Sequence, residues 1–299
     1  MDRLRLTLVM VVWGSIGVFT RYIELSPFVL AFLRAVIALP VLLVFIRRRP
    51  AGQRISFRQT KPYLVSGALI GLAWAALFYG FQNTNISTAV IIYNMCPVYV
   101  MLAAPLVLKE RLTRLRAGIV GISFIGLCLV VGMGGFGPAG LSSQGMWGMI
   151  LSGVSGMLYA AIVIINRKAA NQVDHALATF LQMGAASMVL LPFVLAEGEW
   201  KQVLTVDGTG ILLTCILGVV HTGLAYNLYF STYHRASSIE IASYGYLEPV
   251  FGIVFSVLLL GETLATTQLI GGLMILGSTY LGEWMHSVNA NASKSKTTP

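Results

Sequence analysis

The 299-residue chain is 57% hydrophobic and only 10% charged, with a formal net charge of +9. A soluble globular domain carries about 25% charged residues, so this composition excludes a water-soluble globule. The basic residues lie in short segments between apolar blocks rather than along one helix face, which argues against nucleic acid as a partner. The apolar blocks are about 20 residues long, enough to cross a hydrocarbon core of about 30 Å, and they predict an all-α membrane protein.

Ten apolar blocks predict ten transmembrane helices. Each block must be helical because lipid offers no partner to backbone N–H and C=O groups. Pro27 and Pro62 stand at the starts of the second and third blocks, and a glycine-rich segment at residues 132–140 separates the fifth from the sixth. In chain order the predicted spans are residues 5–22, 27–46, 62–81, 87–107, 115–133, 144–165, 176–195, 208–230, 238–260 and 266–285.

The distribution of Lys and Arg predicts the orientation of the spans. If the helices alternate in direction, 17 of the 20 basic residues fall on one side of the membrane. Arg21 and Lys201 fall on the other side, and Arg34 lies within the second span. Because basic residues are retained on the cytoplasmic side, both termini are predicted to be cytoplasmic. Residues 289–299 are expected to form a polar cytoplasmic tail.

An internal repeat relates the two halves of the chain. The segment YNMCPVYVMLAAPLVLKERL at residues 93–112 resembles YGYLEPVFGIVFSVLLLGETL at residues 244–264. In both, a proline precedes a glutamate by 13 residues; the matched residues are Pro97 and Glu110 in the first segment and Pro249 and Glu262 in the second.

The spacing between the two matched segments divides the chain into two halves of five predicted helices, residues 1–140 and 141–288. Because five is odd, the second half must enter the membrane inverted relative to the first. Inverted repeats are typical of transporters, whose substrate site lies near the membrane midplane between the repeats.

Five sets of residues in both halves of the chain form a recognisable signature: WGSIGVFTR (13–21), Phe32 with Arg34, Pro97 with LKERL (108–112), LEPV (247–250) and LLLGETLATTQLIGGLMILG (258–277). Through these residues the chain resembles the drug/metabolite transporter superfamily, specifically the ten-helix EamA-type exporters, along nearly its whole length. The resemblance implies a central cavity lined mainly by the first, third, fourth, sixth, eighth and ninth helices, opening alternately to each side. It also implies small organic substrates, often amino acids or their relatives, that are usually moved outward.

Two residues depart from the aromatic amino-acid exporters of that family. This chain has Cys96 where they carry an aromatic residue before the proline of the fourth span, and Glu248 where they carry an uncharged residue before the proline of the ninth. Glu248 lies near the middle of its span, where an ionised carboxylate costs several kcal/mol unless it is paired or hydrated. It is expected either to bind a substrate ammonium or exchange a proton, or to be a hydrogen-bonded structural acid beside Pro249.

Arg34 is the second charged candidate. It lies below the outer end of the second span, where it can meet a substrate carboxylate or pair with Glu248. The alternative is a structural side chain that reaches outward to the membrane surface.

Polar side chains on two other helices also point to an interior face. At 100° per residue, His221, Thr222, Tyr226 and Tyr229 share a broad face of the eighth helix that points away from lipid. His221 is expected to be either a proton carrier or a hydrogen-bond partner between helices. On the fourth helix Asn94 shares a face with Ser87, and its counterpart in the second repeat is Tyr246.

Several aromatic residues lie inside the spans rather than at the membrane boundary, where interfacial belts form. Such residues either line a substrate pathway or pack between helices. They are Trp13, Trp74, Tyr79, Tyr159, Tyr226 and Tyr244, of which Trp13, Trp74, Tyr159 and Tyr226 fall at the family's cavity positions.

The sequence predicts no cofactor and no metal site. Cys96, Cys128 and Cys215 lie inside predicted spans without a CxxC or Cys/His cluster. The Walker A, GxSxG and HExxH motifs are absent, so ATP does not drive this protein directly and no hydrolase is indicated. The expected partners are a small-molecule substrate and membrane lipid, with a monomer and a homodimer both left open.

The leading hypothesis is therefore a secondary transporter that exports amino acids or their relatives across the bacterial inner membrane by alternating access. Efflux of drugs or organic cations, proton-coupled through Glu248, is the alternative. An intramembrane enzyme using His221 and Glu248 is a weaker hypothesis, because these residues lie on separate helices without a supporting motif.

Overall fold

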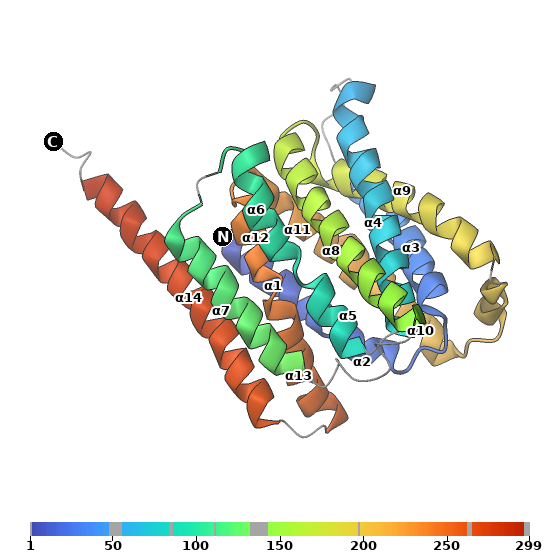
Figure 1. The fold of residues 1–299 in the computed structure, drawn as a ribbon. Coiled ribbons are helices and arrows are strands. Elements are labelled where there is room, and N and C mark those ends of the chain that lie inside the picture. Colours follow the sequence, from blue (N-terminus) through green and yellow to red (C-terminus); the bar gives the residue numbers. More distant parts are fainter. Residues whose placement is uncertain are drawn as a thin grey trace.

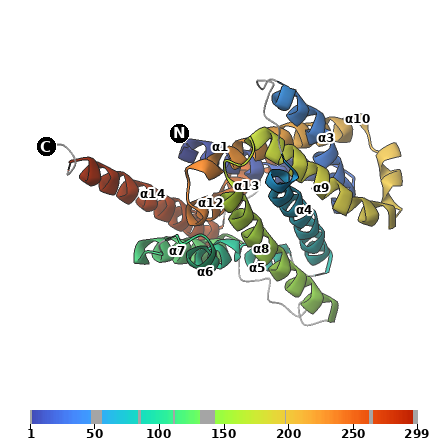
Figure 2. The same cartoon turned by 90° about the horizontal axis from the view of Figure 1, so that it is seen from above.

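The structure is a computed structural model. Among the residues that it describes, every regular element is a helix, as the composition predicts. The described residues are 2–47, 56–83, 86–110, 112–131, 143–196, 198–261 and 265–295. Figure 1 shows the helices packed lengthwise into one bundle. In Figure 2, α7 and α14 lie at one edge of the bundle and α3, α9 and α10 at the other.

The first half of the chain contains seven helices among its described residues. They are α1 (Asp2–Gly14), α2 (Ile16–Thr20), α3 (Pro27–Arg47), α4 (Phe57–Asn83), α5 (Ile86–Tyr93), α6 (Cys96–Val107) and α7 (Arg114–Val131).

The second half adds α-helices together with short 3₁₀ and π segments. In order they are α8 (Ser143–Ala169), α9 (His175–Ala196), the 3₁₀ helix η3 (Glu199–Leu204), α10 (Gly208–Ile216), the π-helix η4 (Leu217–Leu224), α11 (Ala225–Ser231), the 3₁₀ helix η5 (Thr232–His234), α12 (Ser238–Tyr244), α13 (Leu247–Leu260) and α14 (Thr266–Ser295).

Eight helical stretches among the described residues are long and apolar enough to cross a membrane. They coincide with the predicted first to fourth and sixth to ninth spans: Asp2–Thr20, Pro27–Arg47, Phe57–Asn83, Ala89–Val107, Ser143–Ala169, His175–Ala196, Gly208–His234 and Ser238–Leu260. The predicted fifth and tenth spans are the helices α7 and α14. The helical fold is therefore confirmed, whereas the count of ten spans and the cytoplasmic termini stay predictions.

Four of the stretches are interrupted, which the hydropathy pattern does not predict. The first is broken at Ser15, the fourth at Asn94–Met95 and the ninth at Gly245–Tyr246, and the eighth contains the π-helix η4. Pro97 and Pro249 follow two of the breaks. A proline favours such a break, because it removes a helical N–H donor and disfavours helical geometry at the preceding residue. Broken helices of this kind form the substrate sites of many transporters.

The helices are held together by close approaches at small residues and by a few buried hydrogen bonds. A Cβ on Gly67 of α4 would lie 2.5 Å from Gln182 Cα of α9, so only glycine allows this approach. Ser155 of α8 donates its hydroxyl to Ala73 O of α4 at 2.8 Å. Gly67 thus serves the close packing of α4 against α9.

The connections alternate between two ends of the bundle (Figure 1). We call the end with the α3–α4, α6–α7 and α8–α9 connections the basic end, because Arg47, Lys61, Lys109, Arg114 and Arg167 lie at these helix ends. The opposite end, called the far end, carries the α2–α3 and α13–α14 connections. In Figure 1 the first residues of α1 and the last residues of α14 lie toward the basic end.

Candidate functional site

A cavity of about 340 Å³ lies at the centre of the bundle, on the far-end side of the helix breaks. Leu77 and Phe81 from the last turns of α4, Val90 of α5 and Gly252 of α13 place it there. The wall residues with polar or aromatic groups are Trp13, Arg34, Trp74, Phe78, Phe81, Tyr93, Asn94, Tyr159, Tyr226 and Glu248. They come from the helices that the family resemblance implies, with Arg34 of α3 in addition.

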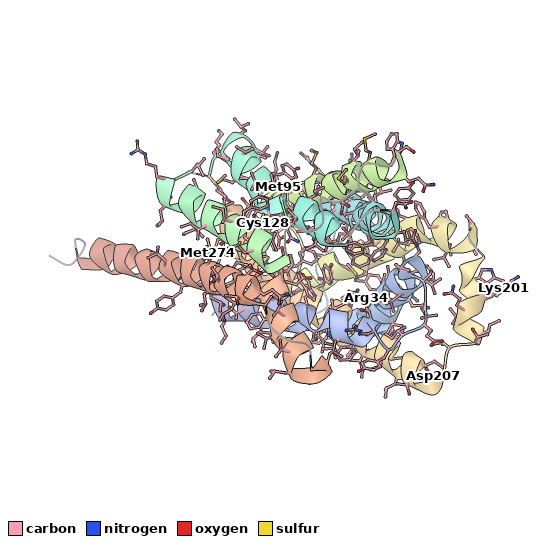
Figure 3. All side chains as sticks on the ribbon, turned by 60° about the horizontal axis from the view of Figure 1, so that its bottom comes forward. Arg34, Met95, Cys128, Lys201, Asp207 and Met274 are labelled. Carbon is pink, nitrogen blue, oxygen red and sulfur yellow. The ribbon has the colours of Figure 1, made fainter. Side chains whose placement is uncertain are left out.

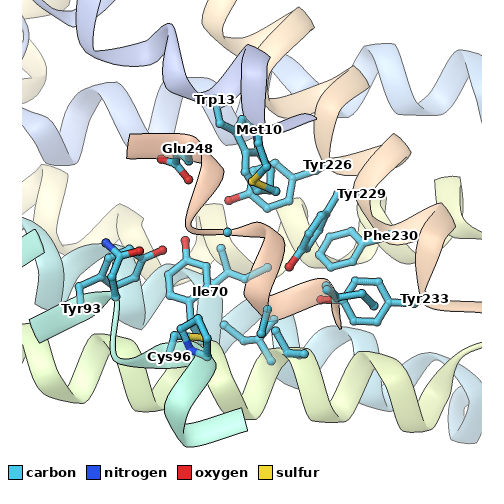
Figure 4. Close-up of a pocket in the computed structure, with 18 residues that line it drawn as sticks. Met10, Trp13, Ile70, Tyr93, Cys96, Tyr226, Tyr229, Phe230, Tyr233 and Glu248 are labelled. Atoms are coloured by element: carbon cyan, nitrogen blue, oxygen red, sulfur yellow. The ribbon is translucent and has the colours of Figure 1, made fainter. Parts of the chain in front are cut away.

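A smaller cavity of about 60 Å³ continues toward the basic end (Figure 4). Met10 of α1, Ile162 of α8 and Tyr233 of η5 line it on that side. The two cavities share the residues Trp13, Tyr93, Asn94, Tyr159, Tyr226 and Glu248. These residues therefore mark the place where the two spaces meet, next to the breaks in the helices.

Glu248 stands in the first turn of α13, directly after the break at Gly245–Tyr246. Figure 4 shows its carboxylate facing the cavity. A Cβ on Gly14 would lie 2.9 Å from Glu248 O, so the glycine at the end of α1 brings α1 against this turn. Among the described residues no side chain or backbone group forms a hydrogen bond or ion pair with the Glu248 carboxylate, which is thus available to a ligand.

Arg34 reaches the same cavity from α3 and is held in place by two neighbours. Its Nε donates to Thr222 Oγ1 at 3.1 Å, and its guanidinium carbon lies 5.6 Å from the centroid of the Trp74 ring. Thr222 in turn donates to Leu217 O at 3.0 Å, a bond within the π-helix η4. In Figure 3 Arg34 lies inside the bundle, whereas Lys201 lies at its periphery. The structure shows no ion pair between Arg34 and Glu248.

The aromatic walls are fixed by contacts with one another. The Trp13 ring lies 4.8 Å from the Tyr226 ring and 5.1 Å from the Tyr229 ring, between ring centroids. Trp74 Nε1 donates to the Tyr159 hydroxyl at 2.6 Å, and the Tyr93 ring packs edge-on against Tyr159 at 5.2 Å. Such interlocked rings give a cavity of fixed shape, apolar on its faces and polar at the hydroxyl groups.

His221 lines neither of the two cavities. Its Nε2 lies 2.9 Å from Ser15 Oγ, and its ring packs edge-on against Phe19. An α-helical wheel puts His221 and Tyr226 on one face, but residues 217–224 form a π-helix, in which the angle per residue is smaller. The backbone O of His221 accepts the Trp13 Nε1 proton at 2.9 Å, so this residue touches the site through its backbone.

Other predicted site residues lie outside the two cavities. Tyr246 is fully buried, Tyr244 is also buried in the core, and Tyr79 is not among the lining residues. Thr222 is buried and reaches the site only through Arg34.

The predicted residue Asn94, in contrast, lies at the cavity wall, where its Nδ2 donates to Val90 O at 2.9 Å. The side chain of Ser87 and the residue Glu262 lie outside the described part of the chain.

Two further tyrosines of the site are not among the residues that the sequence indicates. Tyr93 and Tyr233 line the cavities, together with Tyr229, which the sequence places on the polar face of the eighth helix. Tyr93 directly precedes the predicted Asn94, and Tyr233 follows Tyr229 by four residues. That spacing, which continues one face of a helix, is the signal that identifies Tyr233.

Within the described residues no group of three His, Cys, Asp or Glu side chains comes together in a way that could hold a metal ion. The site instead offers one cation, one carboxylate and a set of aromatic rings. Such an arrangement can bind a small organic molecule that carries charge and an apolar part.

Comparison with known proteins decides the family. The chain matches the EamA-like transporter family over residues 4–132 and again over residues 146–282. The chain belongs to this family. An uncharacterised transporter of Archaeoglobus fulgidus is 30% identical over 285 residues, which cover 93% of this chain and 96% of the relative. The uncharacterised transporter YxxF of Bacillus subtilis is 26% identical over 289 residues, covering 93% and 88% of the two chains.

One relative carries a more specific name. A probable amino-acid metabolite efflux pump of Salmonella typhimurium is 25% identical over 298 residues, covering 95% of both chains. A solved crystal structure matches the fold with a TM-score of 0.78 at 17% identity, covering 93% of this chain and 96% of the other. The family predicted from the sequence motifs is confirmed, and this EamA-like protein is a multi-pass membrane transporter.

Proposed function

We propose that this EamA-like protein exports amino acids or closely related metabolites across the cytoplasmic membrane of a bacterium by alternating access. Its family and the name of the Salmonella relative support the substrate class. The observation that carries the proposal is that Arg34 and Glu248 line one cavity without pairing with each other. The two cavities between the repeats provide the path.

The charges of the cavity suit a molecule that carries both signs. Unpaired charges inside a membrane protein cost several kcal/mol each, so both Arg34 and Glu248 gain from a ligand that supplies their counter-charges. An amino acid does so with its carboxylate and its ammonium group. The volume of about 340 Å³ lies within the range of small-molecule pockets, about 300–1,000 Å³. The ring walls of Trp74, Tyr159 and Tyr226 suit an apolar side chain.

Organic cations are a second candidate class of substrate, and one observation supports them. Glu248 lies beside Trp13, Tyr93 and Tyr226 at the meeting point of the cavities, and ring faces attract cations. A cation would leave Arg34 unpaired in the same cavity. The presence of Arg34 therefore favours the amino acid, and proton exchange at Glu248 belongs to the cation alternative.

Binding to the purified protein distinguishes these candidates. Thermal stabilisation in detergent is measured with the twenty standard amino acids, then with two derivatives of the best stabiliser: the decarboxylated amine and the N-acetylated acid. We expect a free amino acid to stabilise the protein and each derivative, which lacks one charge, to bind at least tenfold more weakly. Equal stabilisation by the amine would favour the cation transporter, and no stabilisation by any amino acid would contradict the proposal.

A further inference from the structure

A cluster of charged and hydroxyl side chains ties the two halves of the chain together at the basic end, away from the cavity residues. Its centre is Glu110, which follows the end of α6. Lys109 just before it adopts a φ of 56°, a left-handed conformation that is rare outside glycine and asparagine. This turn ends α6 and directs Glu110 toward α12 of the second half.

Glu110 makes three hydrogen bonds with one residue. The backbone N–H of Ser238 lies 3.0 Å from Oε1 and 3.2 Å from Oε2, and the Ser238 hydroxyl donates to Oε2 at 2.9 Å. The side chain of Glu110 is only 13% exposed, so these bonds are largely shielded from water. Hydrogen bonds to an ionised group are about twice as strong as neutral ones. Ser238 is the first residue of α12, whose position Glu110 therefore fixes.

Two basic residues extend the cluster. Arg167 at the end of α8 places Nε 3.6 Å from Glu110 Oε1 and donates from Nη1 to Tyr233 O at 2.7 Å. Arg3 of α1 donates to Glu240 of α12 at 2.9 Å. Arg3 and Glu110 belong to the first half of the chain, whereas the other members belong to the second. We call this cluster the basic-end latch: Arg3, Glu110, Arg167, Ser238 and Glu240.

The latch is connected to the cavities through two short helices, α12 and η5. α12 runs from Ser238 to Tyr244 and leads directly into the break at Gly245, which is followed by Glu248. The backbone carbonyl of Tyr233 accepts a hydrogen bond from Arg167, and the residue lines the smaller cavity. The larger cavity lies on the far side of the break, and the smaller one, lined by Ile241 and Ala242 of α12, lies on the side of the latch. The bonds of the latch thus hold the helices together beside the smaller cavity.

We propose that the basic-end latch closes the substrate cavity on the basic side and that its release opens the cavity there. When the bonds of Glu110 with Ser238 and Arg167 break, α12 and η5 can move away from α6. The smaller cavity then widens and opens at the basic end. The inference presupposes the transport cycle of the proposed function, yet it concerns the motion alone and can be measured without any substrate.

A native cysteine reports this motion. Cys96 lines the smaller cavity, next to Pro97 at the start of α6. With Cys128→Ala and Cys215→Ala as the background, Cys96 is the single thiol of the chain. A membrane-impermeant maleimide is applied to vesicles from the basic side or from the far side, and the labelling rate is compared. Glu110→Ala removes the centre of the latch, and Ser238→Ala removes only the hydroxyl bond and guards against loss of fold.

The matched control is Asp174→Asn, which removes one negative charge at the same end. Asp174 accepts the Ala176 N–H at 2.8 Å and takes no part in the latch, and asparagine keeps an acceptor oxygen there. We expect Glu110→Ala to speed labelling from the basic side at least tenfold, Ser238→Ala to speed it about two- to fivefold, and Asp174→Asn to leave it unchanged.

Two results would overturn the proposal: labelling from the basic side that stays unchanged in both latch variants, or an equal increase in Asp174→Asn. Because no substrate enters this assay, it can succeed for a protein that binds no amino acid. Conversely, a protein that transports amino acids but shows no change in labelling refutes the latch alone.

Discussion

Arg34 offers the sharpest single test of how the cavity recognises its substrate. Arg34 lines the cavity, donates from Nε to Thr222 Oγ1 and lies beside the Trp74 ring, so we expect its Nη groups to bind the substrate. A hydrogen bond to a charged group contributes about 1.5–3 kcal/mol, and about 1.4 kcal/mol corresponds to tenfold in affinity. Arg34→Gln should therefore weaken binding of the amino acid by about 10- to 100-fold.

The assay is equilibrium binding of the best-stabilising amino acid to purified variants in detergent. Lys201→Gln is the control, since it removes a positive charge at the far end, outside the cavity. Thr222→Val removes the acceptor that orients Arg34 and should weaken binding about two- to tenfold, the value of a typical hydrogen bond. An Arg34→Gln protein that binds the amino acid as tightly as Lys201→Gln would refute carboxylate recognition by Arg34.

Three further variants test other parts of the site. Glu248→Gln keeps the side-chain size but removes the charge that no described residue pairs, so binding of the amino acid should fall at least tenfold in the same assay while the thermal midpoint stays within a few degrees. Trp74→Phe loses the N–H bond to Tyr159 and leaves a smaller, weaker cation–π partner beside Arg34, so binding should weaken by about 1–2 kcal/mol. Trp147→Phe at the exposed surface should change nothing. Gly156→Ala would put a Cβ 2.6 Å from Tyr93 O and should destabilise the protein by about 1–3 kcal/mol in thermal unfolding, while Gly118→Ala, with open space around it, should not. Full binding in Glu248→Gln or Trp74→Phe, or equal midpoints in the two glycine variants, would contradict these assignments.

The overall fold is largely readable from the sequence because lipid imposes one simple rule. Apolar blocks must be helical, so eight predicted spans reappear as helical stretches with the bounds shifted by a few residues. The family follows equally directly, from motifs around Arg34, Pro97 and Glu248 in both halves of the chain.

The breaks within the helices were not predictable from hydropathy, which reports only how apolar a segment is. The π-helix at Leu217–Leu224 inserts an extra residue per turn and turns His221 toward Ser15 rather than toward the cavity. A helical wheel assumes a constant angle per residue and cannot detect such a local change.

Contacts between distant segments were also beyond the sequence. Glu110 was singled out only as part of the repeat, and its bonds with Ser238 depend on how the two halves pack. Arg34 and Glu248 were both named from the sequence. That they share one cavity without forming an ion pair emerged only from the arrangement of α3 and α13.

Transport in reconstituted proteoliposomes tests the central claim most directly. Vesicles are loaded with the unlabelled amino acid that stabilises the protein best, and uptake of the labelled form is followed as counterflow. Because counterflow needs only a working binding site and alternating access, it does not depend on the coupling ion. We predict uptake well above that of empty liposomes, abolished in the double variant Arg34→Gln/Glu248→Gln and retained in Lys201→Gln. Uptake at the level of empty liposomes for every stabilising amino acid, or full uptake in the double variant, would contradict amino-acid transport through this cavity.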